Sequence, residues 1–238
     1  MNRLFELIRV IGNRYSKEGG KYLENIEKSS DFQEFQKCLH NLTIEDTELD
    51  YNKYKNFFFT PKAQEPGLKF MKLLEEKNYG AGIFFFRPGE GFPIHDHPGM
   101  VVSTKILDGT LATNSFNILD PAKQAIIQRI YNEGKQDEGE YQEILKEGLE
   151  AQDLGEISIP TMHTHFLTPN LKNVHHVKGI GNCAMMDVFF PNDPTRHFYR
   201  ATKIDKSPEG QKKYVKLNME KAGNFNLIEL NYNDYKIK

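Results

Sequence analysis

The sequence predicts a mainly β fold, an antiparallel barrel or sandwich with a helical cap at its N-terminus. Apolar residues follow helical spacing in the first fifty residues. After Gly80 the chain changes to short runs rich in Phe, Val and Ile, separated by Gly, Pro, Asn and Asp at strand-like intervals. Helices followed by many short antiparallel strands indicate this architecture.

Two helices are expected in the first fifty residues. Apolar residues recur at helical spacing from Leu4 to Tyr15, and Gly19-Gly20 ends the pattern. A second helix should start near Asp31, because Asp31 and Glu34 have the spacing of a capping box. Residues 1–50 therefore read as a helical lead-in. The apolar stripe of the second helix is Phe32, Phe35, Leu39 and Leu42.

Eight strands are expected in residues 80–200, which would form the barrel core. Asp108-Gly109 lies between two of them and has the turn chemistry of a tight hairpin, because glycine adopts positive φ at little cost. Two weaker candidates follow, Tyr214–Leu217 and Leu227–Leu230. The eight are Ile83–Phe86, Val101–Leu107, Leu111–Phe116, Ile157–Ile159, Met162–Leu167, Val174–Lys178, Ala184–Phe190 and Thr195–Arg200.

The stretch 121–155 interrupts the strands with many Glu, Lys and Gln residues, and we interpret it as an exposed insertion. No internal repeat and no clear linker divides the chain. We therefore expect residues 1–238 to form a single domain, which their number allows.

Composition excludes several classes of function. The 31 Lys and Arg against 33 Asp and Glu give a net charge of −2, so a basic surface for nucleic acid is not expected. The longest apolar runs are far shorter than the roughly 20 residues of a membrane-spanning helix. The N-terminus leads into no secretory apolar segment. Cys38 and Cys183 cannot build a disulfide framework. We expect a cytoplasmic monomer with no membrane partner.

Seven of the eight histidines lie in the strand-rich part of the chain. His95 and His97 stand at i and i+2, so on an extended segment both rings point to one side and can bind one metal ion. A His-x-His pair alone is weak evidence, because it also fits a surface or structural role. His163 and His165 form a competing pair without a flanking Pro-Gly. The other histidines are His40, His175, His176 and His197.

The surroundings of His95 and His97 resemble the first metal-binding motif of the cupin superfamily. Five residues separate Gly89 from the pair, and Gly109 follows the next strand run. In that motif a Glu stands where this chain has Val102, so the usual carboxylate ligand is missing. The segment from Pro169 to His175 resembles the second motif, which brings a third histidine from a distant strand. The resemblance implies a double-stranded β-helix, or jelly-roll, barrel.

The three-histidine pattern resembles one cupin branch, the thiol dioxygenases. Phe86–Met100, with its His-Pro-Gly-Met block, looks like the corresponding segment of cysteamine dioxygenases and plant cysteine oxidases. The resemblance covers about residues 80–200. Departures are the insertion after Asp120, Asn192-Asp193 where relatives tend to carry an aromatic residue, and the tail. Further similar segments are Lys105–Thr110, Asn173–His175, Ala184–Val188 and Arg196–Tyr199.

The resemblance implies that His95, His97 and His175 bind Fe(II). Three neutral imidazoles would leave three positions open and keep the full dipositive charge on the ion, which favours a deprotonated thiol. Both atoms of O2 would be added to the sulfur of cysteamine, or of the N-terminal cysteine of a peptide or protein, to give a sulfinate. With a protein substrate, family analogy implies oxygen sensing.

Asp187 is the catalytic residue that the resemblance implies, a carboxylate that orients the substrate or the iron ligands. It could equally be a buried hydrogen-bond acceptor or a partner of Arg196. Tyr199 is expected to pack in the barrel, and His176 to point away from His175. We expect Cys38 to be a core residue and Cys183 to be a loop thiol.

Substrate choice depends on arginines. Free cysteine would need a cation for its carboxylate, and no motif assigns Arg87, Arg196 or Arg200 to that role. Arg196 and Arg200 are expected on the last strand, beyond the metal. We therefore expect cysteamine or a Cys-peptide to be oxidised better than free cysteine. The alternative function is a noncatalytic cupin that binds a metal or a small ligand, because lost ligands often accompany lost chemistry.

Overall fold

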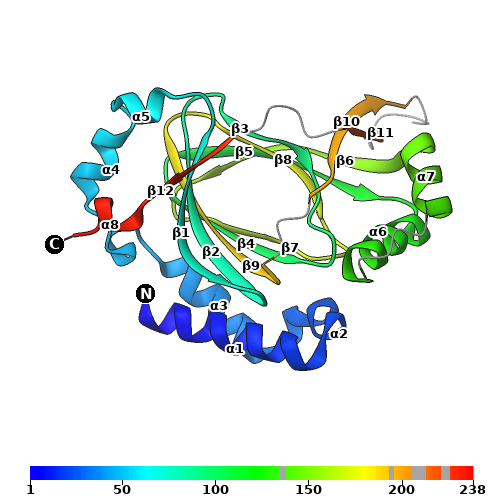
Figure 1. Ribbon diagram of the computed structural model, residues 1–238, viewed down its shortest axis with the longest axis horizontal. Helices are drawn as coiled ribbons and strands as arrows, with labels where there is room; N and C mark the ends of the chain where they lie inside the picture. The colour runs from blue at the N-terminus through cyan, green and yellow to red at the C-terminus, as the bar shows by residue number, and fades with distance from the viewer. Residues whose placement is uncertain (134–137, 193–195, 205–212, 221–225, 238) are drawn as a thin grey trace.

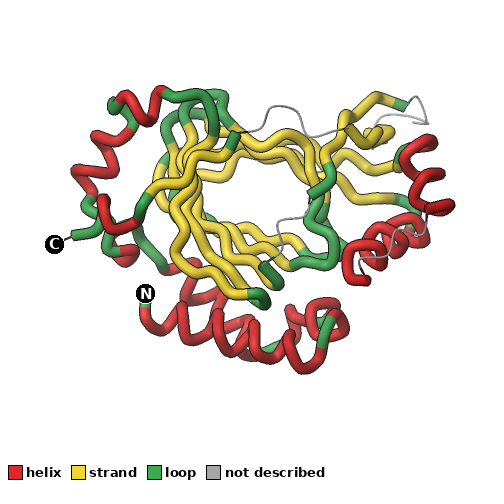
Figure 2. Tube along the Cα trace, in the orientation of Figure 1, coloured by secondary structure: helices red, strands yellow, loops and turns green. Residues whose placement is uncertain are grey.

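The computed structural model describes residues 1–133, 138–192, 196–204, 213–220 and 226–237. In this part of the chain, strands occupy the centre and helices lie below and at both ends (Figures 1 and 2). The helices are α1 (Asn2–Glu18), α2 (Gly20–Glu24), α3 (Ser30–Asn41), α4 (Tyr51–Phe57), α5 (Pro61–Gln64), α6 (Pro121–Glu133), α7 (Glu138–Glu147) and α8 (Tyr232–Tyr235), with short 3-10 helices η1 (Ile26–Lys28) and η2 (Glu45–Thr47).

The first sheet has six strands in the order β12-β1-β2-β9-β4-β7. All neighbours are antiparallel except β12 and β1. Figure 1 shows α1, α2 and α3 beneath this sheet. Its strands are β1 (Leu68–Glu76), β2 (Tyr79–Phe86), β4 (Val101–Asp108), β7 (Thr164–Leu167), β9 (Cys183–Phe190) and β12 (Leu227–Leu230).

The second set of strands pairs antiparallel in a closed ring, β10-β11-β6-β5-β8-β3. The pairing of Phe198 with His95 joins β10 to β3 and completes the ring. The structure thus confirms the predicted mainly β, cupin-type antiparallel barrel with N-terminal helices. The strands are β3 (Gly91–His95), β5 (Thr110–Ile118), β6 (Leu149–Pro160), β8 (Val174–Gly179), β10 (Phe198–Lys203) and β11 (Lys213–Glu220).

The apolar run of strand β2 is continuous rather than alternating because both faces of the strand are buried. Ile83 and Phe85 pack in the core shared with the N-terminal helices, whereas Phe84 and Phe86 pack in the core between the sheets. A strand covered on both faces needs apolar residues at every position. A third core lies between the second sheet and α6 and α7, and includes Phe116, Ile144 and Tyr199.

Most predicted elements are present, with changes at their ends. Both predicted N-terminal helices form, as α1 and α3. All eight predicted core strands and both tail strands are found, although Thr195, the predicted start of the last core strand, lies outside the described residues. The stretch 121–155 contains α6 and α7, but β6 begins at Leu149, well before the predicted Ile157. Strands β1 and β3 were not predicted.

The hairpin predicted at Asp108-Gly109 is wrong. Gly109 does make the turn, with φ of 80°. However, β4 pairs with β7 and β9, and β5 pairs with β6 and β8, so the turn carries the chain from one sheet to the other. The residues of a turn predict that the chain reverses direction there, but they do not predict which strands the two flanking strands pair with.

The predicted capping box of the second helix is also wrong. The cap residue is Ser29, which makes no side-chain capping bond. Asp31 instead accepts a hydrogen bond from Arg14 at 2.9 Å, and Glu34 accepts one from Arg3 at 2.7 Å. Both carboxylates therefore tie α3 to α1, because the neighbouring helix offers charged donors.

None of the helices among the described residues is long and apolar enough to cross a membrane.

Two glycines with the same φ allow a matched test of the sheet-to-sheet turn. Gly89 (φ 81°) has open space where a Cβ would lie, whereas a Cβ on Gly109 would lie 2.4 Å from the Asn182 carbonyl oxygen. Gly89→Ala should lower the free energy of unfolding by about 1 kcal/mol, the cost of a positive φ. Gly109→Ala should lower the free energy of unfolding by roughly 1–3 kcal/mol more than Gly89→Ala, since the backbone around Asn182 must move to admit the methyl group. Urea unfolding measures both, and equal losses would contradict the role of close approach.

Candidate metal centre

His95 is placed by the pairing of β3 with β8. In this ladder His95 lies directly opposite His175, so both side chains are on the same face. The Nδ1 atom of His95 lies 2.8 Å from the Pro93 carbonyl oxygen. Because a carbonyl only accepts, Nδ1 carries the proton and the Nε2 lone pair is left for a metal.

His97 follows the end of β3 and is held through its backbone by Asn173. The His97 N–H donates to Asn173 Oδ1 at 3.1 Å, and Asn173 Nδ2 donates back to the His97 carbonyl at 2.7 Å. Asn173 itself precedes β8 by one residue. The two segments that carry the predicted ligands are therefore locked together beside the ligands themselves.

The three predicted metal ligands converge. One ring nitrogen from each of His95, His97 and His175 lies within 4.8 Å of the others, and all three residues are buried. The Nε2 atoms of His97 and His175 are 3.0 Å apart. Two imidazole nitrogens bound in neighbouring positions of one ion, each at about 2.1 Å, would lie about 3 Å apart. The donor set therefore fits a single metal ion.

The three rings are neutral at neutral pH, the form that binds metals. Burial lowers the pKa of His95 to about 4. Burial also holds the pKa of His97 and of His175 well below the ordinary value, and the positive charge of Arg196 acts in the same direction on both. No proton has to be displaced from these imidazoles before an ion binds.

The competing pair is not part of this cluster. His163 is exposed, and its Nδ1 lies 3.3 Å from the Thr161 carbonyl oxygen. His165 is half-buried, and burial lowers its pKa to about 4. Within the described residues, no third His, Cys, Asp or Glu joins these two to complete a metal-binding group.

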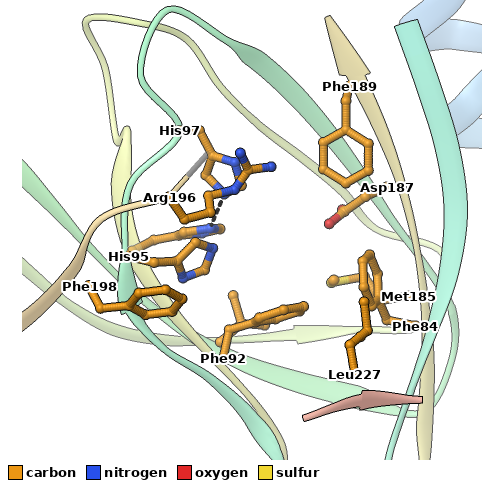
Figure 3. A pocket seen from close by; sticks show the side chains of 12 residues that line it. Phe84, Phe92, His95, His97, Met185, Asp187, Phe189, Arg196, Phe198 and Leu227 are labelled. Carbon is orange, nitrogen blue, oxygen red and sulfur yellow. Dashed lines mark hydrogen bonds between the residues drawn. The ribbon is translucent and has the colours of Figure 1, made fainter. Parts of the chain in front are cut away.

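The histidines form one wall of a cavity of about 290 Å³ between the sheets. Figure 3 shows His95, His97 and Arg196 on one side and Asp187, Phe189 and Met185 on the other. The remaining lining is mostly apolar, which favours a small ligand held away from water. The full lining is Phe84, Phe92, His95, His97, His175, Val177, Met185, Asp187, Phe189, Arg196, Phe198 and Leu227.

Asp187 lies on the inner face of β9, between Met185 and Phe189. Its carboxylate is buried and accepts a hydrogen bond of 2.5 Å from Thr104, its register partner on β4. Burial raises the pKa of Asp187 to about 7, although the Thr104 hydrogen bond and the charge of Arg196 both lower it. The residue is thus both a buried acceptor and a lining residue of the cavity, and its catalytic role stays a prediction.

Arg196 is the lining residue that sequence reasoning misplaced. It was expected on the last strand beyond the metal, but β10 begins at Phe198, and Arg196 precedes it. Its guanidinium lines the cavity, donates to the Met100 sulfur at 3.3 Å and lies 5.9 Å from the ring centroid of Phe189. No local pattern around Arg196 marks this position, because it depends on the long-range pairing of β10 with β3.

Asp96, between the first two ligands, was also missed. Its carboxylate accepts hydrogen bonds from the His197 ring at 2.8 Å, the His197 N–H at 2.7 Å and the Tyr199 hydroxyl at 2.7 Å. Tyr199 is buried in the third core, as expected, but its hydroxyl has this specific partner. Burial, reinforced by the charge of Asp96, holds the pKa of Tyr199 well above its ordinary value.

Three minor predictions can also be compared with the structure. Cys38 is half-buried and packs against the first core, so its prediction as a core residue is confirmed only in part. His176 is half-buried on the face opposite to the buried His175, as expected. Cys183 is not a loop thiol. It is fully buried at the start of β9, and burial raises its pKa to about 12, because the inner face of β9 continues one residue further than its apolar run suggests.

The metal ligands can be tested by metal content. We expect about one Fe(II) per chain after anaerobic loading. His95→Ala, His97→Ala or His175→Ala should each lower bound iron at least tenfold, because one of three donors is removed. The His163→Ala, His165→Ala double variant is the control and should keep its iron. Loss of iron in the control, with retention in His175→Ala, would move the site to the second pair.

The buried carboxylate predicts a pH dependence of stability in the metal-free protein. Asp187 titrates near 7 in the native state and near 3.8 when unfolded, so between these values the native state binds more protons. Its contribution to the free energy of unfolding therefore falls as pH rises. As the pH rises from about 5 to about 8, the free energy of unfolding of Asp187→Asn should increase by about 3 kcal/mol relative to that of the wild type. Urea unfolding at both pH values would contradict this if the difference between the proteins stayed constant.

Comparison with known proteins identifies relatives. The family described as PCO_ADO matches residues 38–235. The 2-aminoethanethiol dioxygenase of Homo sapiens is 29% identical over 147 residues, which cover 57% of this chain and 53% of the relative. The enzyme of that name from Mus musculus is 28% identical over 147 residues, covering 57% and 55%. The chain thus spans about half the length of these curated relatives.

Two solved structures are similar at low identity. A cupin superfamily protein from Desulfitobacterium hafniense is 13% identical with a TM-score of 0.33, covering 54% of this chain and 81% of the other. A protein from Klebsiella pneumoniae with a double-stranded β-helix domain is 11% identical with a TM-score of 0.36, covering 56% and 84%. The family match extends over most of the sequence, and this chain belongs to the PCO_ADO family.

Proposed function

We propose that this chain is an Fe(II)-dependent thiol dioxygenase that converts the thiol of cysteamine, or of an N-terminal cysteine, to a sulfinate. The observation that carries the proposal is the convergence of three neutral, buried imidazoles on one wall of a small, mostly apolar cavity. In the reaction, both atoms of O2 are added to sulfur. Sulfur loses four electrons and O2 gains four, so no organic reductant is needed.

The donor set and the reaction together favour iron. Imidazole suits several first-row metals, zinc among them. Zinc has no redox chemistry, whereas oxidation of a thiol by O2 moves electrons. Fe(II) held by His95, His97 and His175 would supply a dipositive centre that favours the thiolate over the thiol and that can exchange electrons with O2.

Asp187 supports a substrate with an amino group near the thiol. It is one of two charged side chains among the described lining residues, the other being Arg196. Figure 3 shows it across the cavity from His95 and His97. In an aminothiol the nitrogen and sulfur are two carbons apart, so a substrate whose sulfur lies beside the histidines can extend its ammonium toward Asp187. Binding of a cation would favour the ionised form of Asp187.

The size of the cavity permits more than cysteamine. A volume of about 290 Å³ equals on the order of ten water molecules, whereas cysteamine has four non-hydrogen atoms. The aromatic walls of Phe84, Phe92 and Phe198 would keep bulk water from the thiolate. The remaining space supports a Cys residue with a chain attached at its carbonyl carbon. With a protein substrate, the extent of oxidation of that protein would depend on the oxygen concentration, so oxygen sensing stays a prediction. The cytoplasmic location and the monomeric state also stay predictions.

Arg196 is the lining residue that bears on the oxidation of free cysteine. Its guanidinium lines the cavity and could pair with a carboxylate, but it already contacts the Met100 sulfur and the Phe189 ring. A carboxylate would have to compete with these contacts. We therefore keep the order in which cysteamine and Cys-peptides are better substrates than free cysteine, and Arg196 becomes the residue that tests it.

The proposal predicts a substrate order. Anaerobically purified, iron-loaded protein should oxidise cysteamine and a Cys-peptide at least tenfold faster than free cysteine, each at equal concentration in air. Mass spectrometry would follow the gain of two oxygen atoms on sulfur, and an oxygen electrode would follow the uptake of one O2 per thiol.

Two results would revise this function. Fast oxidation of free cysteine, abolished selectively by Arg196→Met, would make Arg196 a carboxylate-binding residue and reverse the order. Iron bound at full stoichiometry with no oxidation of any thiol would favour the noncatalytic metal- or ligand-binding cupin.

A further inference from the structure

Asp96 joins the metal-binding loop to the strand that closes the ring. Its carboxylate is almost fully buried, with 2% of the residue exposed. Besides accepting three hydrogen bonds from His197 and Tyr199, Asp96 donates its own N–H to the His197 carbonyl at 3.1 Å. Four hydrogen bonds thus connect one residue to His197, which precedes β10, and to Tyr199 within β10.

The position of Asp96 makes these bonds relevant to the flanking histidines. On an extended segment, alternate side chains point to opposite sides, so fixing Asp96 on one side fixes His95 and His97 on the other. Strand β3 ends at His95, and no strand includes residues 96–100. His97 is therefore beyond the support of the ladder and depends on Asn173 and on its neighbour Asp96.

The His97 ring itself lacks the usual support. A metal-binding histidine normally donates its other ring N–H to an acceptor, which fixes the orientation of the ring. His95 has this acceptor in the Pro93 carbonyl, but the buried Nδ1 atom of His97 has no hydrogen-bond partner among the described residues. The hydrogen bonds that hold His97 to Asn173 therefore act through its backbone and not through its ring.

We infer that Asp96 is a positioning residue for the metal centre, which holds His95 and His97 in their metal-binding orientation through its hydrogen bonds to His197 and Tyr199. This inference rests on the proposed function, since it requires that the three histidines bind a metal ion. Asp96 is not among the described residues that line the cavity, so we place it outside the substrate-binding surface. Its effect is on the affinity for metal and on the geometry of the site, through the loop that it anchors.

The chain offers a matched control for the loss of one hydroxyl. Tyr54, on α4, donates to Asp108 at 2.9 Å, and Tyr199 donates to Asp96 at 2.7 Å. Both tyrosines are buried, with 2% and 4% exposed. Tyr54 packs with the N-terminal helices, on the face of the first sheet that is turned away from the cavity. Tyr54→Phe and Tyr199→Phe therefore remove the same kind of bond at different distances from the metal.

The experiment titrates metal-free variants of residues 1–238 with Co(II) without oxygen and reads the visible absorption bands of the bound ion. Tyr199→Phe should weaken Co(II) binding about tenfold and shift the bands, and Asp96→Asn should weaken it further. Tyr54→Phe should match wild type in affinity and spectrum. Urea unfolding of the metal-free proteins checks that the two Phe variants lose similar stability, so that the difference in affinity is not a general loss of structure.

Each result separates this inference from the metal site itself. Wild-type affinity and spectrum in Tyr199→Phe would overturn the inference and leave the metal centre intact. An equal loss of affinity in Tyr54→Phe would also overturn it, because the effect would then follow general stability. Wild-type protein that binds no Co(II) and no Fe(II) would overturn both the proposed function and the inference.

Discussion

The pairing of β3 with β8 is the constraint on which the proposed metal centre depends. It sets His95 opposite His175, and a slip of one residue would move one ring to the other face. The register shifts between Phe92 and His95, around Pro93. Proline has no N–H for the ladder, so an irregularity at this point is expected. The same Pro93 provides the carbonyl that orients His95. The irregularity at Pro93 therefore both interrupts the regular ladder and orients the ring of His95.

Strand β9 places Asp187 on the opposite wall of the cavity, again through the alternation of side chains along a strand. Its alternate residues Met186 and Val188 pack against the helical side, and Met185 and Phe189 pack between the sheets. Asp187 shares the parity of the inner set and is forced into an apolar interior. A carboxylate buried there is costly unless it has a partner, and Thr104 provides one from the adjacent strand. The cavity is thereby given one carboxylate at a defined place.

The sequence was informative wherever the signal is local. His95, His97 and Asp187 could be selected because spacing and a family resemblance both act over a few residues, and the buried runs of β2 and β9 could be recognised as strands. Asp31 and Glu34 were misassigned because their partners, Arg14 and Arg3, lie in another helix. The hairpin at Gly109 was wrong because the strands on either side of it pair with distant strands. Arg196 and Asp96 were missed for the same reason: their roles are set by how β10 closes on β3.

That closure explains how the metal centre and the fold support each other. The ring closes through one residue pair, Phe198 with His95, and through the hydrogen bonds of Asp96. The seam of the barrel is therefore also the segment that carries two of the three proposed ligands. The third, His175, comes from β8, almost eighty residues further along the chain, so the three rings meet only when β3 pairs with β8. An ion that binds these paired strands and not the unfolded chain would stabilise the folded state by mass action. A bound metal ion would therefore hold together the two segments that position its own ligands.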